Sequence, residues 1–261
     1  AAGAGEEDLV LVLLSGGGPA NRIAPAPPLT LTEKQALTRA LLRSGAAIDE
    51  INTVRKRVSR IKGGRLAALA APACVVTLAI SDVPRDDPAI IASGPTVPDP
   101  STSRDALAVI EHRKIEVPAA VRALIEDPAQ ETPKPGDPLF ERCVFRIVAR
   151  PVDALEAASA ACEAAGYDPV LLGADVEGEA RRIGRLHARL AKDYLRLGRK
   201  VALISGGELT VTMTGSGRGG PNQEYALALA MALEGKPGIA ALAADTDGTD
   251  GGGGDAADPA G

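Results

Sequence analysis

The stretch over residues 201–230 carries the residue pattern with the clearest chemical potential. Within it, the sequence GSGRGG (residues 215–220) places Arg218 among glycines, and Pro221 follows at the start of a predicted helix. Glycines allow successive backbone N–H groups to point into one concavity, and a helix N-terminus favours negative charge. The loop therefore predicts an anion site with Arg218 as an added positive charge. A glycine-rich hairpin followed by a helix cap is the alternative.

Carboxylates form two further groups that could do chemistry. Asp245, Asp247 and Asp250 share one tight loop after an apolar segment, and they repel one another unless a cation compensates them. Mg²⁺ bound together with a phosphate ligand fits such a loop, and a solvated turn is the alternative. Asp82 lies near Asp86 and Asp87 at the end of another predicted strand. A carboxylate there could accept a proton from a substrate hydroxyl, although most loop acids are simply solvated.

A basic segment is the third candidate. Lys62 and Arg65 are separated by two glycines and follow Lys56, which could together bind a carboxylate or a phosphate. The alternative is a solvated basic helix face. The two histidines, His112 and His187, lie on predicted helices among charged residues, and we interpret both as surface residues with no ligand or triad role.

The elements that must position these residues alternate in type. Residues 127–138 (DPAQETPKPGDP) are predicted to be a linker. Beyond the linker, alternating strand and helix patterns predict a mainly parallel sheet with helices on both faces, which is the α/β class. In such sheets ligands lie outside the carboxyl ends of the strands, where every candidate motif falls. The predicted elements after the linker are strand 142–149, helix 152–165, strand 169–172, helix 179–197, strands 201–204 and 210–214, a helix from residue 222, and strand 239–244.

Composition bounds the function. Net charge is −5 and only 2% of residues are aromatic, which argues against a nucleic-acid partner. The sequence contains no run of 18 apolar residues, so no membrane span is expected. The three cysteines lack metal or disulfide spacing, which favours reduced thiols in the cytoplasm. The chain begins at Ala1 without Met and stops in a glycine-rich stretch, so we expect both ends to be incomplete.

One rival interpretation comes from glycine spacing. Gly215, Gly217 and Gly220 fit G-x-G-x-x-G before a predicted helix, and Asp245 ends the next predicted strand. This is a nicotinamide-dinucleotide pattern. Against it, residues 210–214 alternate polar and apolar, whereas the first strand of such a fold is continuously apolar. Neither a nucleophile elbow nor a Walker A sequence is present.

Six segments together resemble the type II glycerate kinases, which have a C-terminal MOFRL domain. The resemblance implies phosphorylation of D-glycerate to 2-phosphoglycerate with ATP and Mg²⁺, in a cleft between two α/β domains. These would be a Rossmann-like domain over residues 1–138 and a MOFRL-type domain with a mixed sheet over residues 139–261, each incomplete at its outer end. The six segments, in order, are LLSGGG (13–18), KGGRLA (62–67), ISDVPRDDPAIIASGPT (80–96), LISGGE (203–208), GRGGPNQE (217–224) and ADTDGTDG (244–251).

The resemblance also implies roles for particular residues and leaves a homodimer open. Catalytic roles fall on Asp82, Arg218 and Asp247, substrate binding on Lys62 and Arg65, and metal binding on Asp245, Asp247 and Asp250. The expected partners are D-glycerate and a nucleotide. The expected nucleotide-binding residues are Gly16, Gly17, Gly18, Gly206, Gly207, Glu208, Gly217, Gly219, Gly220 and Asn222.

Four features depart from the family pattern. Residues 19–22 read PANR where the family often has SALL, Pro221 replaces a frequent arginine, and Arg85 replaces a glycine. The family's N-terminal segment with a lysine thought to matter for catalysis is not found before Ala1. A hydroxypyruvate reductase, a label given to some members, and an inactive anion-binding homologue are therefore the alternatives.

Overall fold

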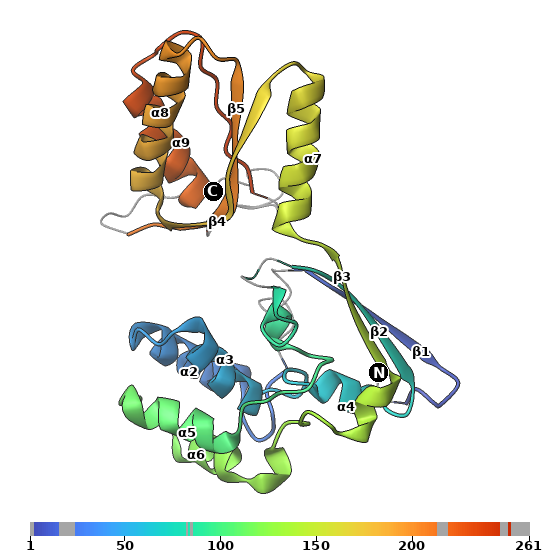
Figure 1. The fold of residues 1–261 in the computed structure, drawn as a ribbon. Coiled ribbons are helices and arrows are strands. Elements are labelled where there is room, and N and C mark those ends of the chain that lie inside the picture. The colour runs from blue at the N-terminus through green and yellow to red at the C-terminus, as the bar shows by residue number, and fades with distance from the viewer. Residues whose placement is uncertain are drawn as a thin grey trace. The chain divides into compact units, whose positions relative to one another are not determined.

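The structure is a computed structural model that describes residues 3–15, 24–81, 83, 86–212, 219–245 and 250–251 of the 261-residue chain. The chain divides into two compact units, unit 1 over Ala1–Arg150 and unit 2 over Pro151–Gly261. Both are of the α/β class (Figure 1). Each unit has its own parallel sheet, which confirms the predicted class.

Unit 1 is built on a three-stranded parallel sheet in the order β1-β2-β3. The strands are β1 (Leu9–Leu14), β2 (Cys74–Ile80) and β3 (Cys143–Ala149). Leu9 is paired with Cys74 and Val75 with Cys143, so the central strand is β2. Apolar β-branched and leucine residues favour this buried parallel pairing.

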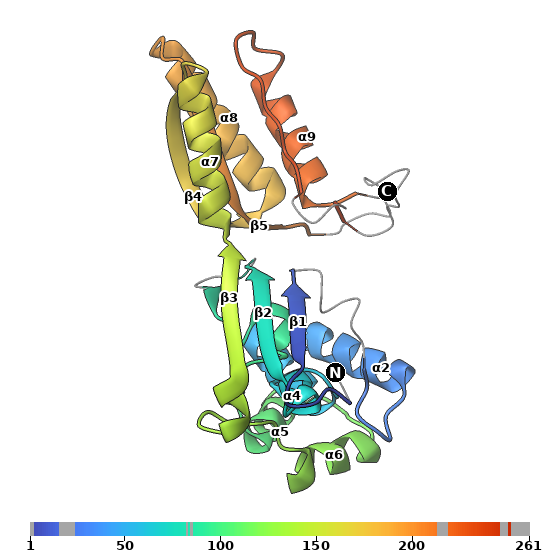
Figure 2. The same ribbon diagram turned by 90° about the vertical axis from the view of Figure 1, so that its right-hand side faces the viewer.

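The two faces of this sheet differ. Val12, Leu14 and Val75 are buried on one face, where α4 (Arg65–Ala70) and Ile91 pack. On the other face Leu9, Leu11 and Leu13 are 55–62% exposed. Figure 2 shows the sheet in front and the helices of the unit behind it. Among the described residues of unit 1, the helices therefore lie on one face of this sheet.

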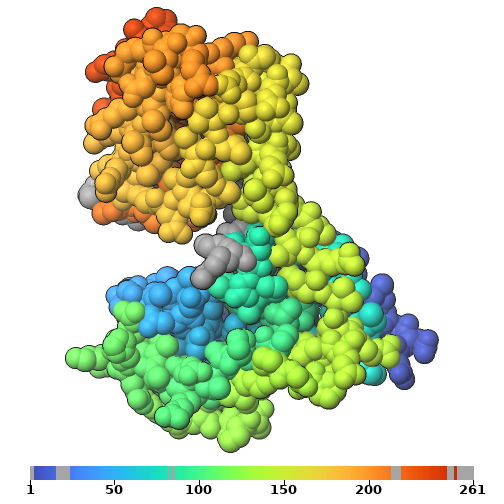
Figure 3. Space-filling model, viewed as in Figure 1, coloured from blue at the N-terminus to red at the C-terminus, as the bar shows by residue number. Residues whose placement is uncertain are grey.

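Four helices form a second core in unit 1 from α2 (Leu31–Arg43), α3 (Ile48–Arg57), α5 (Ser103–His112) and α6 (Ala119–Glu126). Leu41, Val54 and Ile110 are at most 1% exposed within it. In the space-filling view the blue and green surfaces of α2 and of α5 and α6 are continuous (Figure 3). The N-cap of α2 is Thr30, which forms a capping box with Glu33.

The predicted linker belongs to the packed part of unit 1. Residues 128–130 and 138–142 form short 3-10 helices, Thr132 is 2% exposed, and the N–H of Asp99 donates to the carbonyl of Pro133 at 3.0 Å. Beyond it, β3 pairs with β2. The division into compact units therefore lies at Arg150 and Pro151, whereas the sequence predicted it after Pro138. Proline and charge suggested a linker, but buried ion pairs anchor the segment.

Unit 2 contains a two-stranded parallel sheet of β4 (Asp168–Glu179) and β5 (Val201–Thr210). The helices are α7 (Pro151–Ala164), α8 (Ala180–Arg196) and α9 (Pro221–Leu233). The described residues thus form a parallel sheet where a mixed one was expected, and the predicted strand 239–244 is not a strand. Residues 201–210 form one strand, so no separate strand begins at Thr210.

The interface between α8 and α9 corrects the interpretation of one histidine. His187 is 7% exposed, and its Nδ1 lies 3.0 Å from the hydroxyl of Tyr225. Burial lowers the pKa of His187. This residue is therefore a core residue of unit 2 and not a surface one. Across the described residues, no helix is both long and apolar enough to cross a membrane.

Candidate functional site

Several of the predicted site residues lie outside the described residues. These are Asp82, Arg218 and Asp247 of the predicted catalytic set, and Gly16, Gly17, Gly18 and Gly217 of the predicted nucleotide-binding set. Their roles stay predictions. The other predicted residues can be placed.

The SGGE segment lies within a strand and not at a strand end. Ser205, Gly206, Gly207 and Glu208 are internal to β5, whose register with β4 shifts around Gly173 and Val176. Gly207 has φ +138°, and a Cβ there would lie 2.1 Å from the carbonyl oxygen of Val176. The close approach of β4 explains the glycine without a ligand. The role of Gly206, Gly207 and Glu208 in nucleotide binding stays a prediction, but the strand that was predicted to end at residue 204 continues to Thr210.

The N-terminus of α9 already holds a carboxylate. The N–H of Asn222 donates to Oδ1 of Asp250 at 2.9 Å, and the N–H of Gln223 donates to Oδ2 at 2.8 Å. The two backbones are in contact here, because a Cβ on Gly220 would lie 2.5 Å from the carbonyl carbon of Asp250 and 2.5 Å from the amide nitrogen of Gly251. Asp250 therefore caps the helix and satisfies two of the amides that we expected to hold a phosphate.

The predicted metal ligands Asp245 and Asp250 therefore make different contacts. The side-chain amide of Asn222 donates to Oδ2 of Asp245 at 3.2 Å. Asp245 and Asp250 are the two ends of the DTDGTD sequence, so both ends of this sequence are bonded to the start of α9. No group of three His, Cys, Asp or Glu side chains suited to a metal ion occurs among the described residues. Asp250 is a helix cap in this structure, and Asp247 lies outside the described residues.

The KGGR turn separates the two predicted substrate ligands. Gly63 and Gly64 have φ +61° and +80°, and a Cβ on Gly64 would lie 2.9 Å from the carbonyl oxygen of Val97. The guanidinium of Arg65 donates to the carbonyl oxygens of Ser59 and Gln130. Lys62 is 3% exposed and donates to Oγ of Ser93 at 3.3 Å. Arg65 is therefore bound to main chain, whereas Lys62 retains donor capacity.

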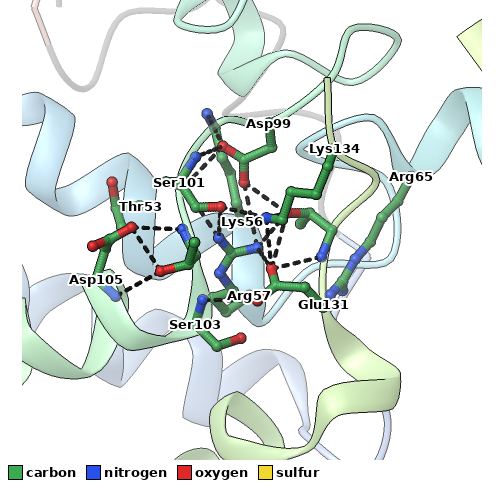
Figure 4. A network of polar contacts seen from close by, with 12 residues as sticks. Thr53, Lys56, Arg57, Arg65, Asp99, Ser101, Ser103, Asp105, Glu131 and Lys134 are labelled. Carbon is green, nitrogen blue, oxygen red and sulfur yellow. Dashed lines mark hydrogen bonds and ion pairs between the residues drawn. The ribbon is translucent and has the colours of Figure 1, made fainter. Parts of the chain in front are cut away.

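Next to this turn lies a buried ion-pair network, formed by Lys56, Arg57, Asp99, Glu131 and Lys134 (Figure 4). Asp99 is fully buried, 3.1 Å from Nζ of Lys56 and 3.4 Å from the Arg57 guanidinium. Glu131 lies 2.7 Å from Arg57 and 2.8 Å from Lys134. Each buried cation in this network thus has a carboxylate partner.

The network holds its carboxylates ionised. Burial alone would raise the pKa of Asp99, but Lys56, Ser101 and Arg57 bring it below its usual value. The pKa of Glu131 is lowered in the same way. Burial would raise it, but Lys134 and the backbone N–H groups of Ser103 and Thr132 lower it to about 2. Sequence analysis missed Arg57 and Asp99, which are 43 or more residues from several of their partners. Asp99 lies between two prolines, but no spacing links it to Arg57.

A second group of cations has no carboxylate partner within the described part of the chain. Lys34, Arg55 and Lys62, here called the cation trio, come from α2, α3 and the KGGR turn. Burial, then Arg55 and Arg65, lowers the pKa of Lys34 to about 8. Burial, then Arg55, Lys34 and Lys56, lowers the pKa of Lys62 to about 7. The trio is therefore a desolvated patch of mutually repelling positive charge.

The loop facing Lys62 is conformationally strained. Ser93 has φ +62° and Ala92 has φ +53°, a left-handed region that few residues other than glycine adopt. The hydroxyl of Ser93 donates to Oδ1 of Asn52 at 3.1 Å, which fixes its oxygen toward Lys62. Such strain persists where packing imposes it and is frequent at functional sites.

Comparisons with known proteins identify the family to which this fold belongs. A family model described as a domain of unknown function, DUF4147, matches residues 1–126, and the MOFRL family model matches residues 201–261. A crystal structure of glycerate kinase from Thermotoga maritima superposes with a TM-score of 0.81 at 42% identity, over 97% of this chain and 60% of that one. The fold is therefore that of the DUF4147 and MOFRL proteins.

The names of curated relatives identify this family more specifically. The chain is 43% identical to D-glycerate 2-kinase of Thermotoga maritima over 94% of its own length and 58% of that protein. It is 36% identical to glycerate kinase of Macaca fascicularis, of which it covers 73%. A protein of Agrobacterium vitis with a provisional hydroxypyruvate reductase name is 51% identical over 95% of this chain and 57% of that one. The chain belongs to the glycerate kinase family. It spans 57–64% of the first three curated relatives.

Proposed function

We propose that the full-length protein phosphorylates D-glycerate to 2-phosphoglycerate with ATP. The observation that carries this proposal is the 43% identity to a D-glycerate 2-kinase over 94% of the chain. The likeness extends to three dimensions in the Thermotoga maritima glycerate kinase structure. Phosphoryl transfer requires mainly positioned reactants and stabilised charge, and the cation trio offers positive charge that no described carboxylate pairs with in unit 1.

The residues can be given proposed roles. Lys62 binds an anionic group of the substrate or product, and Arg65 holds the KGGR turn through the carbonyls of Ser59 and Gln130. Arg218 contacts nucleotide phosphates, and Asp82 accepts the proton of the glycerate hydroxyl. These last two roles come from the family resemblance.

The metal is treated separately. Family kinship implies use of ATP, and we propose Mg²⁺ as its counter-ion. The Asp250 carboxylate does not fit the predicted ligand set, because both of its oxygens accept backbone N–H groups of α9. We therefore assign no metal-dependent step to Asp250, and Asp245 and Asp247 remain the proposed ligands.

A second candidate function is hydroxypyruvate reduction, which the name of the Agrobacterium vitis relative favours. Dinucleotide binding would place the pyrophosphate on the amides at the start of the helix after G-x-G-x-x-G. The start of α9 instead accepts the Asp250 carboxylate. This contact argues against a dinucleotide pyrophosphate at the start of α9, and the identity to a D-glycerate 2-kinase favours the kinase.

A coupled ADP-release assay on the full-length protein tests the proposal. We expect turnover that requires both D-glycerate and Mg²⁺. Oxidation of NADH by hydroxypyruvate without ADP release would replace the kinase with the reductase. Activity with neither pair of substrates would support the inactive anion-binding homologue.

A further inference from the structure

We infer that the cation trio of Lys34, Arg55 and Lys62 is a binding site for a phosphate dianion. This inference deepens the proposed function and rests on it only for the identity of the phosphorylated metabolite. The site lies entirely within unit 1, where α2 and α3 pack together and the KGGR turn precedes α4. Arg65, the other predicted anion ligand, is not part of it.

Burial and missing partners carry the inference. Lys34 is 5% and Lys62 3% exposed. The only acceptors of their ammonium groups among the described residues are the Ala24 carbonyl at 3.5 Å and the Ser93 hydroxyl at 3.3 Å. An ammonium group has three donors, so each lysine keeps capacity for further hydrogen bonds.

Arg55 adds an independent observation. Its Nε is buried and has no hydrogen-bond partner among the described residues. Burial lowers the pKa of this guanidinium, as it does for both lysines. Buried polar groups are normally hydrogen-bonded, and an isolated buried charge is costly. The three cations, whose donors are incompletely paired among the described residues, therefore indicate a ligand that supplies negative charge and acceptor oxygens.

The neighbouring network shows that this fold can supply carboxylates where it needs them. Lys56 lies on the same helix as Arg55 and is 7% exposed, and Asp99 pairs with it at 3.1 Å. In the described part of the chain no carboxylate pairs with any member of the cation trio. The charged groups that lower the pKa of Lys34 and Lys62 are all cations, namely Arg55 and Arg65 for Lys34, and Arg55, Lys34 and Lys56 for Lys62.

The charge balance identifies the ligand class. Three cations compensate a dianion better than the single charge of a carboxylate, and a phosphate presents several oxygens to separate donors. Asn52 and Ser93 extend the polar surface beside Lys62. Binding would also raise the lysine pKa values, so that the protein takes up protons near neutral pH.

Calorimetric titration of the full-length protein with inorganic phosphate tests the site. We expect Lys62→Met and Arg55→Met each to weaken phosphate binding by at least about tenfold, the loss of a charge-assisted contact. The exposed cations Lys236 and Arg39 provide matched controls, and Lys236→Met and Arg39→Met should leave binding within about twofold. If Lys62→Met does not fold, the half-buried Arg55 still carries the test through Arg55→Met.

Titration in buffers of different ionisation enthalpy adds a readout that a structural role would not change. We expect net proton uptake on phosphate binding by wild type, and less uptake by Lys62→Met. Absence of phosphate binding in wild type, or equal binding in wild type and both variants, would overturn the inference.

Competition distinguishes the sources of the phosphate and separates this inference from the proposed function. Displacement of inorganic phosphate by 2-phosphoglycerate assigns the site to the product, and displacement by ADP assigns it to the nucleotide. Displacement by D-glycerate, with the same loss in Lys62→Met, would make the ligand a carboxylate and overturn the dianion assignment. These titrations need no turnover, so phosphate binding without ADP release would contradict the kinase but leave this site intact.

Discussion

The start of α9 in unit 2 and the cation trio in unit 1 are both centres of positive potential, but among the described residues only the first has a carboxylate partner. At α9 the Asp250 carboxylate accepts two backbone N–H groups at 2.8–2.9 Å. In the trio, Lys62 has a serine hydroxyl as its only acceptor among the described residues. A glycine-rich helix start is thus a weaker indication of a ligand than buried cations without carboxylates.

The ion-pair network provides the reference for this comparison, because it shows the cost of removing an internal carboxylate. We expect Asp99→Asn to lower the free energy of unfolding by about 3–5 kcal/mol, since Lys56 and Arg57 would be left buried without their partner. Urea denaturation measures the change. Glu126→Gln is the control, as its pair with Arg122 is exposed and should contribute at most about 0.5 kcal/mol. A small effect of Asp99→Asn would mean that the two cation groups do not differ energetically.

The pH dependence of the free energy of unfolding tests the cation trio directly, through Lys62. The pKa of Lys62 is about 7 in the folded protein and 10.5 in its ordinary state. Between these values the unfolded chain binds more protons, so the free energy of unfolding should rise with pH. For Lys62 the rise is about 2 kcal/mol between pH 7 and pH 9.

Urea denaturation without phosphate, in wild type and Lys62→Met, measures this rise, and the variant should show a shallower one. Parallel curves for wild type and Lys62→Met would show that Lys62 stays charged in the folded protein over this pH range, as it does in the unfolded chain. Added phosphate should flatten the wild-type curve, because the bound anion holds the proton on the lysine.

Nucleotide affinity tests whether the glycine loop before α9 binds phosphate despite the Asp250 cap. We expect Arg218→Ala to reduce kcat/KM for ATP by roughly thirtyfold, about 2 kcal/mol, with an unchanged melting temperature. Steady-state kinetics at varied ATP measure this loss. Wild-type kinetics in Arg218→Ala would remove the loop from the site and leave the cation trio as the better-supported anion site.

Local pattern predicted the elements of this protein better than the partners of its side chains. The alternation after residue 140 gave the α/β class and the helices of unit 2, because period and burial are local properties. The boundary between the units was predicted before β3 and lies after it, because β3 pairs with β2 across more than 60 residues. No local pattern contains such a contact.

The candidate site shows the same limit. Lys62 was predicted from its glycine neighbours, whereas Lys34 and Arg55 were not singled out, because only the packing of α2 on α3 brings them near it. The cap at α9 was missed for a related reason. Asp250 follows Asn222 by 28 residues, and a DTDGTD sequence resembles a metal loop until its partners are known.

The smallest expected effect tests whether Asp250 is a cap or a metal ligand. Asp250→Ala removes the acceptor of the Asn222 and Gln223 amides, and we expect a loss of about 1 kcal/mol in the free energy of unfolding. Hydrogen exchange should accelerate at these two amides in particular. Thr102→Ala removes the corresponding cap of α5, where Oγ1 accepts from the N–H of Asp105, and provides a matched scale for the loss. A cap predicts that the Mg²⁺ requirement of the kinase stays unchanged in Asp250→Ala. An increased Mg²⁺ requirement without a change in stability or exchange would instead return Asp250 to the metal site, and the start of α9 would then be open to an anion like the cation trio.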